Sequence, residues 1–215
     1  VAVTETWLTR RVSELTLSGY QRVSRLDRRA GIRLDRGGIV LYARADFAAN
    51  IVHIGDSPID ERSWHIVHCD HGPVLLCVWY RPPNDGEVDS ISRFEREYAS
   101  FSKDSIAFVA IGDFNVHNPE WLRYSRRATP EGTALEQTCC THGWKQHVRD
   151  PTRGPYLLDL VLSSFSSGVR CKVVPGIHED DHDGVLVTIK VSIPASQPVQ
   201  REVFDFRKAD WSRFK

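Results

Sequence analysis

The apolar residues of this chain form many short runs and no long one, and this limits the possible folds more than any other feature of the sequence. The runs are rich in Val, Ile, Leu, Trp and Tyr, and turn residues separate them. Short runs of β-branched and aromatic residues between turns are typical of β-strands. We therefore predict strands over residues 1–3, 38–42, 64–68, 74–80, 106–111, 144–148, 157–162, 169–174 and 185–193.

Helical spacing is confined to a few segments between these runs. Apolar residues recur on one helical face in residues 91–101, and again in residues 134–139, where Gly143 follows as a stop signal. Residues 8–17 show a weaker pattern of the same kind. The apolar positions of the first two are Ile91, Phe94, Tyr98 and Phe101, and Ala134, Leu135, Thr138 and Cys139.

The arrangement of these segments indicates the fold class. The strands outnumber the helices and do not alternate with them, which does not fit a regular βαβ fold. An α+β sandwich of two sheets, with helices on the outer faces, fits better. Trp7, Trp79 and Trp144 lie among strand or helix residues, and we expect them in the core.

Composition and charge exclude several classes of protein. The 28 basic side chains balance 28 acidic ones, so bulk charge cannot hold nucleic acid and any such site must be local. No apolar run approaches the roughly 18–20 residues of a membrane helix, and no signal-peptide pattern opens the chain. The 5 cysteines form no even disulfide framework, which indicates free, mostly buried thiols in a reducing compartment. We expect a soluble protein that is not secreted and binds no membrane.

Polar residues follow several of the predicted strands, at positions where sites are commonly built. Glu5, Tyr80, and Asp113 with Asn115 each come after an apolar run, and the acidic stretch 179–183 precedes another. Each feature alone has an ordinary explanation: a surface carboxylate, a core or rim aromatic, a turn, or a solvated acidic loop. Their combination favours a site.

Asp159 lies inside the apolar run 157–162, where an unpaired carboxylate would cost several kcal/mol on burial. His182 is a suitable partner, because a carboxylate that accepts from one ring nitrogen fixes the orientation of the imidazole and stabilises its protonated form. With Glu5, Asp113 and Asp181, the pair describes a site of oxygen ligands for Mg²⁺ or Mn²⁺. These groups together specify phosphoester hydrolysis.

Six segments, in order, resemble motifs of the endonuclease/exonuclease/phosphatase superfamily. Within it they are most similar to the apurinic-endonuclease-like domain that precedes the reverse transcriptase of non-LTR retrotransposons. The likeness spans residues 1 to about 193. The segments are TETWL at 4–8, WYRPP at 79–83, IGDFNVHNPEW at 111–121, DPTRG at 150–154, LLDLVLSS at 157–164 and DDHDGVLV at 180–187.

The resemblance implies a four-layered α/β/β/α sandwich of the DNase I-like type and metal-dependent cleavage of DNA. It also implies a nick in chromosomal target DNA that exposes a 3′-hydroxyl to prime reverse transcription. Carried over by position, Glu5 looks like the metal ligand, Tyr80 like the tyrosine of the site rim, and Asp113 like the water-activating aspartate. Asn115 resembles the asparagine that helps to hold the phosphate, and Thr152 a threonine of the hydrogen-bond network. Asp159 looks like the partner of the terminal histidine, Asp181 like a residue tied to the metal or its water, and His182 like the histidine that contacts the scissile phosphate.

The sequence departs from the family pattern in two places. The family's first strand, which carries an asparagine of the site, would lie before Val1, and Asp180 stands where serine is usual. The absence of methionine and the start at Val1 predict a piece of a longer protein. We therefore expect an N-terminally truncated domain over 1–193, then a linker over 194–215 that leads to a reverse transcriptase domain in the parent chain.

Local basic clusters are the candidates for binding double-stranded DNA. Residues 9–36 contain eight arginines and three acidic residues, with Arg28 and Arg29 among the arginines, and a second cluster follows Trp121. Solvated surface loops are the alternative reading of both clusters. Trp121 could stack on bases or pack inward. The second cluster consists of Arg123, Arg126 and Arg127.

Three alternatives remain open from the sequence. A repair endonuclease for abasic sites and a phosphatase of the same superfamily would use the same chemistry, and a catalytically dead DNA-binding remnant would need none. A mobile-element endonuclease is the leading interpretation. It would act in the nucleus, where the target DNA lies, or be found in the cytoplasm before import.

Overall fold

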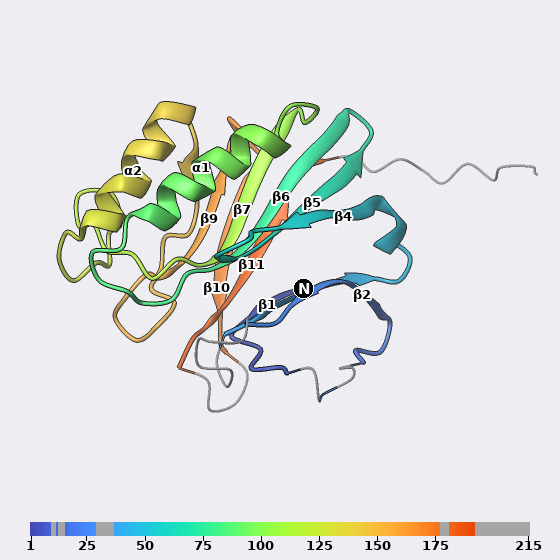
Figure 1. Cartoon of the computed structure of the whole chain (residues 1–215), viewed down its shortest axis with the longest axis horizontal. Coiled ribbons are helices and arrows are strands. Elements are labelled where there is room, and N and C mark those ends of the chain that lie inside the picture. The colour runs from blue at the N-terminus through green and yellow to red at the C-terminus, as the bar shows by residue number, and fades with distance from the viewer. Residues whose placement is uncertain (10–11, 13–15, 29–36, 177–180, 192–215) are drawn as a thin grey trace, which may run out of the picture.

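A computed structural model describes residues 1–9, 12, 16–28, 37–176 and 181–191 of the chain (Figure 1). All nine predicted strands and both of the stronger helices are present in it. The elements are β1 (Ala2–Thr4), β2 (Tyr20–Leu26), β3 (Ile39–Arg44), η1 (Ala48–Asn50), β4 (Ile51–Asp56), β5 (Glu61–Cys69), β6 (Gly72–Tyr80), α1 (Asp89–Phe101), β7 (Ala107–Asp113), α2 (Pro130–His142), β8 (Lys145–Gln146), β9 (Asp159–Ser163), β10 (Val169–Val174) and β11 (Gly184–Ile189).

A six-stranded sheet in the order β4-β5-β6-β7-β9-β8 is the centre of the molecule. β6 and β7 run parallel, and the other neighbours are antiparallel. α1 and α2 lie on one face of this sheet, and the sheet β1-β3-β2 lies on the opposite side (Figure 1). The β10–β11 hairpin pairs with no other described strand and packs its half-buried residues against the core of the six-stranded sheet.

Alternation along β6 assigns its side chains to two cores, because successive residues of a strand point to opposite faces. Trp79 points toward the helices and packs against Phe94 of α1, with ring centroids 4.7 Å apart. Val78 and Tyr80 point the other way and pack with Ile39 and Leu41 of β3. Tyr80 therefore ends β6 in the space between the two β layers.

The predicted α+β sandwich is confirmed. The described residues show one helical layer and two β layers, and the second β layer consists of two separate pieces, β1-β3-β2 and β10-β11. No α-helix of the described residues covers the outer face of that second layer. The expectation of an absent first strand stays a prediction.

Some expectations for single segments were wrong. β2 and β4 are strands that the sequence patterns did not indicate. Residues 10–11 and 13–15 lie outside the described part of the chain, so the weaker helical pattern over 8–17 stays a prediction. Trp79 and Trp144 are buried as expected, but Trp7 is 58% exposed. The five cysteines are free, and three of them, Cys69, Cys77 and Cys139, are buried.

Two further expectations concern the C-terminal region and membranes. Residues 192–215 lie outside the described part of the chain, so the boundary near residue 193 and the linker over 194–215 stay predictions. No helix within the described residues has the length and apolar character that a membrane crossing requires.

Gly112, directly before the end of β7, occupies a position that excludes a side chain. Its φ is 138°, and a Cβ there would fall on the carbonyl oxygen of Trp79 in the neighbouring strand. We expect Gly112→Ala to lower the free energy of unfolding by about 3 kcal/mol, measured by denaturant titration. Gly86→Ala is the matched control: its φ is also positive but nothing lies within 4 Å, so about 1 kcal/mol is expected. Equal losses in the two variants would contradict the steric argument.

Candidate active site

Three of the predicted site residues form one row across the six-stranded sheet. Tyr80 pairs with Asp113 across β6 and β7, and Asp113 pairs with Asp159 across β7 and β9. Directly paired residues on neighbouring strands point to the same face of the sheet. Glu61 extends the row on the other side of Tyr80. Strand register therefore brings residues 80, 113 and 159 together.

Asp159 holds the histidine of the predicted site. Nδ1 of His182 lies 2.8 Å from Oδ2 of Asp159, which leaves Nε2 free. Burial lowers the pKa of His182, but the hydrogen bond and charge of Asp159, with the charge of Asp113, outweigh burial and bring it to about 9. His182 is therefore an imidazolium at neutral pH and can donate a hydrogen bond from Nε2.

Thr152 fixes the backbone that carries Asp159. Its side chain is completely buried, and its hydroxyl accepts hydrogen bonds from the backbone N–H groups of Leu158 (3.1 Å) and Asp159 (3.0 Å). Its carbonyl oxygen accepts from the backbone N–H of Asp183 at 2.7 Å. Thr152 thus links the start of β9 to the segment that carries His182.

Asp113 is nearly enclosed, with 1% of its surface exposed. Burial and the charge of Asp159 raise its pKa to about 8, against the opposing effects of His182 and the backbone N–H of Asn115. The Asn115 side chain donates to Oδ2 of Asp113 at 2.6 Å. A carboxyl group held near its neutral form at physiological pH can take up or release a proton.

Asn115 adopts a left-handed backbone conformation, with φ 46°, directly after the strand end. Asparagine tolerates this region better than most residues, and such positions are common at functional sites. Nδ2 of Asn115 also donates to the carbonyl oxygen of Arg81 at 3.0 Å. The amide is therefore fixed between the ends of β6 and β7.

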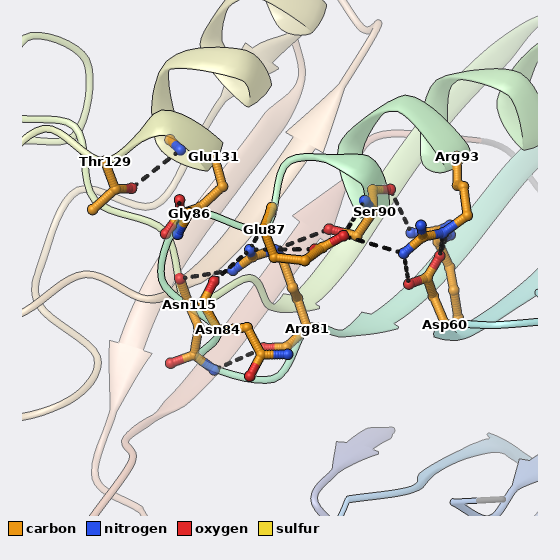
Figure 2. A network of polar contacts seen from close by, with 12 residues as sticks. Asp60, Arg81, Asn84, Gly86, Glu87, Ser90, Arg93, Asn115, Thr129 and Glu131 are labelled. Atoms are coloured by element: carbon orange, nitrogen blue, oxygen red, sulfur yellow. Dashed lines mark hydrogen bonds and ion pairs between the residues drawn. The ribbon is translucent and has the colours of Figure 1, made fainter. Parts of the chain in front are cut away.

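Arg81 is the centre of the polar network that supports this turn (Figure 2). It is 1% exposed, and its guanidinium donates to the carbonyl oxygen of Asn115 at 3.2 Å and to Oγ of Ser90 at 3.1 Å. It also donates to the carbonyl oxygens of Asn84 (3.1 Å) and Glu87 (2.6 Å). Its own backbone N–H donates to the carbonyl oxygen of Asp113 at 2.8 Å. Arg81 thus ties loop 82–88 to the residues at the end of β7.

Glu5 reaches the site from β1. It is exposed, and a hydrogen bond joins it to Tyr80. Burial, that hydrogen bond and the charges of Glu5 and Asp113 raise the pKa of Tyr80 far above its ordinary value. Tyr80 therefore stays a neutral phenol that can donate, and the charge of Glu5 is close enough to contribute to the raised pKa of Asp113.

Asp181 is the predicted site residue that the structure does not bring into this group. Its exposed carboxylate forms an ion pair with Arg153, although His182 is the next residue. Arg153 is itself near enough to His182 for its charge to oppose protonation of the ring. The metal role of Asp181 stays a prediction.

The acidic residues of the site are the candidate ligands for a cation. Within the described ranges, no group of three or more His, Cys, Asp or Glu side chains is arranged to hold a metal ion. Small hard cations such as Mg²⁺, however, commonly keep several waters and bind one or two carboxylates together with substrate phosphates. Glu5 is an exposed carboxylate, and the negative charges of Asp159 and of Glu5 itself raise the pKa of Asp113. The residues fit a hydrated cation held through Glu5.

The predicted DNA contacts lie in different surroundings. Arg28 is largely buried, with Nε 2.5 Å from Glu61 and its guanidinium over the ring of Tyr80, so it belongs to the wall of the site. Arg29 lies outside the described residues.

Trp121 is half-buried against the core. Of the second cluster, Arg123, Arg126 and Arg127 are exposed, and Arg127 pairs with Asp85 at 2.8 Å.

Reasoning from the sequence missed three residues around the site. Arg81 could have been noticed as a charge directly after a buried strand, where burial demands partners. Glu61 and Arg153 carried no comparable pattern, because their importance comes from partners distant in sequence, Arg28 and Asp181.

Comparisons with known proteins identify the family and the fold of this chain. A family model described as Endonuclease-reverse transcriptase matches residues 74–186, more than half of the chain.

Among solved structures, the endonuclease domain of TRAS1, a telomere-specific non-LTR retrotransposon, aligns with a TM-score of 0.59 and 16% identity over 81% of each chain. The human Nocturnin catalytic domain with bound sulfate aligns with a TM-score of 0.57 and 11% identity, over 81% of this chain and 73% of that one. The 3′ phosphatase NExo from Neisseria, bound to a product DNA hairpin, gives 0.55 and 15%, over 87% of this chain and 86% of that one. No curated protein matches the sequence. At these identities the structural likeness is one of fold.

Proposed function

Since this chain belongs to the Endonuclease-reverse transcriptase family, within the endonuclease/exonuclease/phosphatase superfamily, we propose that it is a metal-dependent endonuclease that hydrolyses a phosphodiester of double-stranded DNA. The observation that carries the proposal is the row Tyr80, Asp113 and Asp159, with His182 bonded to Asp159. The row joins a neutral donor, a carboxyl group of raised pKa and an imidazolium in one place.

Each residue has a separate task in this proposal. Nε2 of His182 donates to a non-bridging oxygen of the phosphate, and Asp159 keeps the ring charged and oriented. Asp113 accepts the proton of the attacking water, and Tyr80 contacts the phosphate without adding negative charge. The Asn115 amide donates to Asp113 and Arg81, so it orients the Asp113 carboxylate, and a contact with the phosphate would require one of these two bonds to open. Glu5 would hold Mg²⁺ or Mn²⁺, which supplies neutralisation of phosphate charge and stabilisation of the leaving oxyanion.

The biological role follows from the family. We infer that the enzyme nicks target DNA, so that the exposed 3′-hydroxyl primes a reverse transcriptase domain in the same parent chain. The family's description and the fold that the chain shares with a retrotransposon endonuclease support this role. The target DNA would be met in the nucleus, with the protein in the cytoplasm before import.

A catalytically dead DNA-binding remnant is the second candidate. The ion pair between Asp181 and Arg153 favours it, because it holds a predicted metal ligand outside the carboxylate group. A remnant would bind DNA without any dependence of strand cleavage on Asp113. Repair and phosphatase activities would differ from target nicking only in the substrate.

Nicking of supercoiled plasmid separates these functions. We expect Mg²⁺-dependent conversion to the open circle by the full chain and none by Asp113→Ala. Asp104→Ala is the matched control, because Asp104 is an exposed acid beyond the opposite end of β7 and should leave the rate unchanged. Equal conversion by all three proteins would reject the proposal. Duplexes with an abasic site or a 3′-phosphate, tested beside the plasmid, would reveal a preference for the repair or phosphatase reaction.

The pH dependence of nicking tests the role of Asp159. Activity needs Asp113 ionised and His182 protonated, so the rate should rise as pH approaches 8 and fall above about 9. The Asp159 carboxylate raises both pKa values, and a neutral amide would lower both. We therefore expect Asp159→Asn to reduce the rate roughly 10²-fold and to move both limbs of the profile to lower pH, with little change in melting temperature. Collapse of thermal stability would instead make Asp159 a structural acid.

A further inference from the structure

Trp7 is a large aromatic side chain that the structure leaves in solvent beside the site. It is 58% exposed, and its Nε1 donates to Oε2 of Glu5 at 3.2 Å. Trp64, Trp79 and Trp144 are all buried in the core, so the exposure of Trp7 is unusual in this chain. Its ring lies where a ligand bound at Glu5 would meet it.

The backbone that presents Trp7 is strained. Glu5 and Trp7 both have a φ of 51°, a region that bulky residues rarely adopt. Backbone hydrogen bonds from Thr6 to Gly38 (3.3 Å) and from Trp7 to Gly37 (2.9 Å) hold this conformation. Strain of this kind persists when the surrounding structure enforces it, and it is concentrated at functional positions. The same turn that aims Glu5 into the site therefore turns the indole outward.

We propose that Trp7 is a binding subsite for a nucleobase next to the scissile phosphate. This inference rests on the proposed function, because the base is placed next to Trp7, and Trp7 bonds Glu5, the residue proposed to hold the cation at the scissile phosphate. The exposed indole face offers stacking to any base, and the Nε1 hydrogen bond to Glu5 fixes the ring plane relative to the phosphate site. Such stacking is tolerant of sequence, because every base has a π-face.

If Trp7 stacks on a base, aromatic and non-aromatic replacements of Trp7 should differ in their affinity for DNA. Loss of one base–aromatic contact is expected to raise the Kd for DNA roughly 5- to 150-fold. Trp7→Phe keeps a smaller π-face and should stay within about 3-fold of the wild type. Trp7→Leu keeps apolar surface without a π-face, and it should be nearly as weak as Trp7→Ala.

The experiment measures binding of the full chain to a short DNA duplex in EDTA, where no cleavage occurs. Wild-type tryptophan emission should be quenched by the duplex, and Trp7→Phe should lose that quenching while it keeps most of the affinity. Ile106→Ala is the control: Ile106 is also 58% exposed but lies beyond the opposite end of β7, so its removal should change neither quantity. Trp7→Gly, which removes the strain, should melt at or above the temperature of Trp7→Ala.

The outcomes for the subsite and for the endonuclease function can be told apart. Wild-type affinity in Trp7→Ala or Trp7→Leu would overturn the subsite, whatever the nicking assay shows. Equal weakening by Trp7→Ala and Ile106→Ala would also overturn it, because general apolar contact would explain both. The protein could also show both fluorescence quenching by DNA and tighter binding by Trp7→Phe than by Trp7→Leu, yet never nick DNA. That result would support the subsite and reject the endonuclease function.

Discussion

Replacement of His182 by alanine is expected to lower the rate of plasmid nicking roughly 10³-fold, with the melting temperature nearly unchanged. The imidazolium bonds directly to Asp159 of the row formed by Tyr80, Asp113 and Asp159, whereas the guanidinium of Arg28, over the ring of Tyr80, is paired with Glu61. Loss of the imidazolium removes a charged hydrogen bond to the phosphate that is strongest in the transition state. Single-turnover nicking rates at saturating enzyme would measure the effect.

Two controls make the His182 result specific. His147→Ala removes a half-buried histidine that bonds Ser163, at the opposite end of β9 from Asp159, and should leave the rate unchanged. Added imidazole should restore part of the nicking by His182→Ala, because it can occupy the vacated space and bond Asp159. A full rate in His182→Ala would remove this histidine from the mechanism.

Arg81→Met is expected to lower the free energy of unfolding by about 3–5 kcal/mol. The methionine fills much of the buried space of Arg81 but leaves the carbonyl oxygens of the half-buried Glu87 and Asn115 and of the exposed Asn84 without this donor. For a chain of this size, that loss corresponds to a fall in melting temperature of roughly 10 °C. Denaturant titration and thermal melts would measure both quantities.

Arg123→Met is the matched control for Arg81. Arg123 is exposed, so its replacement should change the free energy of unfolding by less than about 0.5 kcal/mol. Arg81→Lys keeps the charge with fewer donors, and we expect an intermediate loss of stability with a larger fall in kcat than change in KM. A loss below about 1 kcal/mol in Arg81→Met would show that loop 82–88 and Asn115 do not depend on this guanidinium.

The sequence predicted correctly those strands that consist mainly of buried apolar residues. β6, β7 and β9 are almost entirely buried, so their composition reveals them. β2 contains Arg22 and Arg25 and is largely exposed, and β4 contains His53 and Gly55 with an irregular register between them. Strands with so few buried residues leave little hydrophobic pattern to detect.

The sequence indicated the residues of the candidate site and the Asp159–His182 contact, but not how the strands align the other residues. Polar residues after apolar strands identified Tyr80 and Asp113, and an acid within an apolar run identified Asp159 with the need for a partner. The register that aligns these three depends on strand order, which the pattern does not contain. The exposure of Trp7 escaped prediction for a related reason, because Trp7 lies on the same exposed side of the alternating segment as Val1, Val3 and Glu5, and the sequence pattern does not say which side faces solvent.

The β10–β11 hairpin has a consequence for how the protein responds to warming. His182 precedes β11, and the described polar links from this segment to the central sheet and its loops are the His182–Asp159 bond, the Asp183–Thr152 bond and the Asp181–Arg153 ion pair, beside the apolar packing of the hairpin on the core. A hairpin that pairs with no other described strand can detach locally below the temperature of global unfolding. Gentle heating should therefore switch the enzyme off reversibly while its circular dichroism spectrum still reports an intact protein.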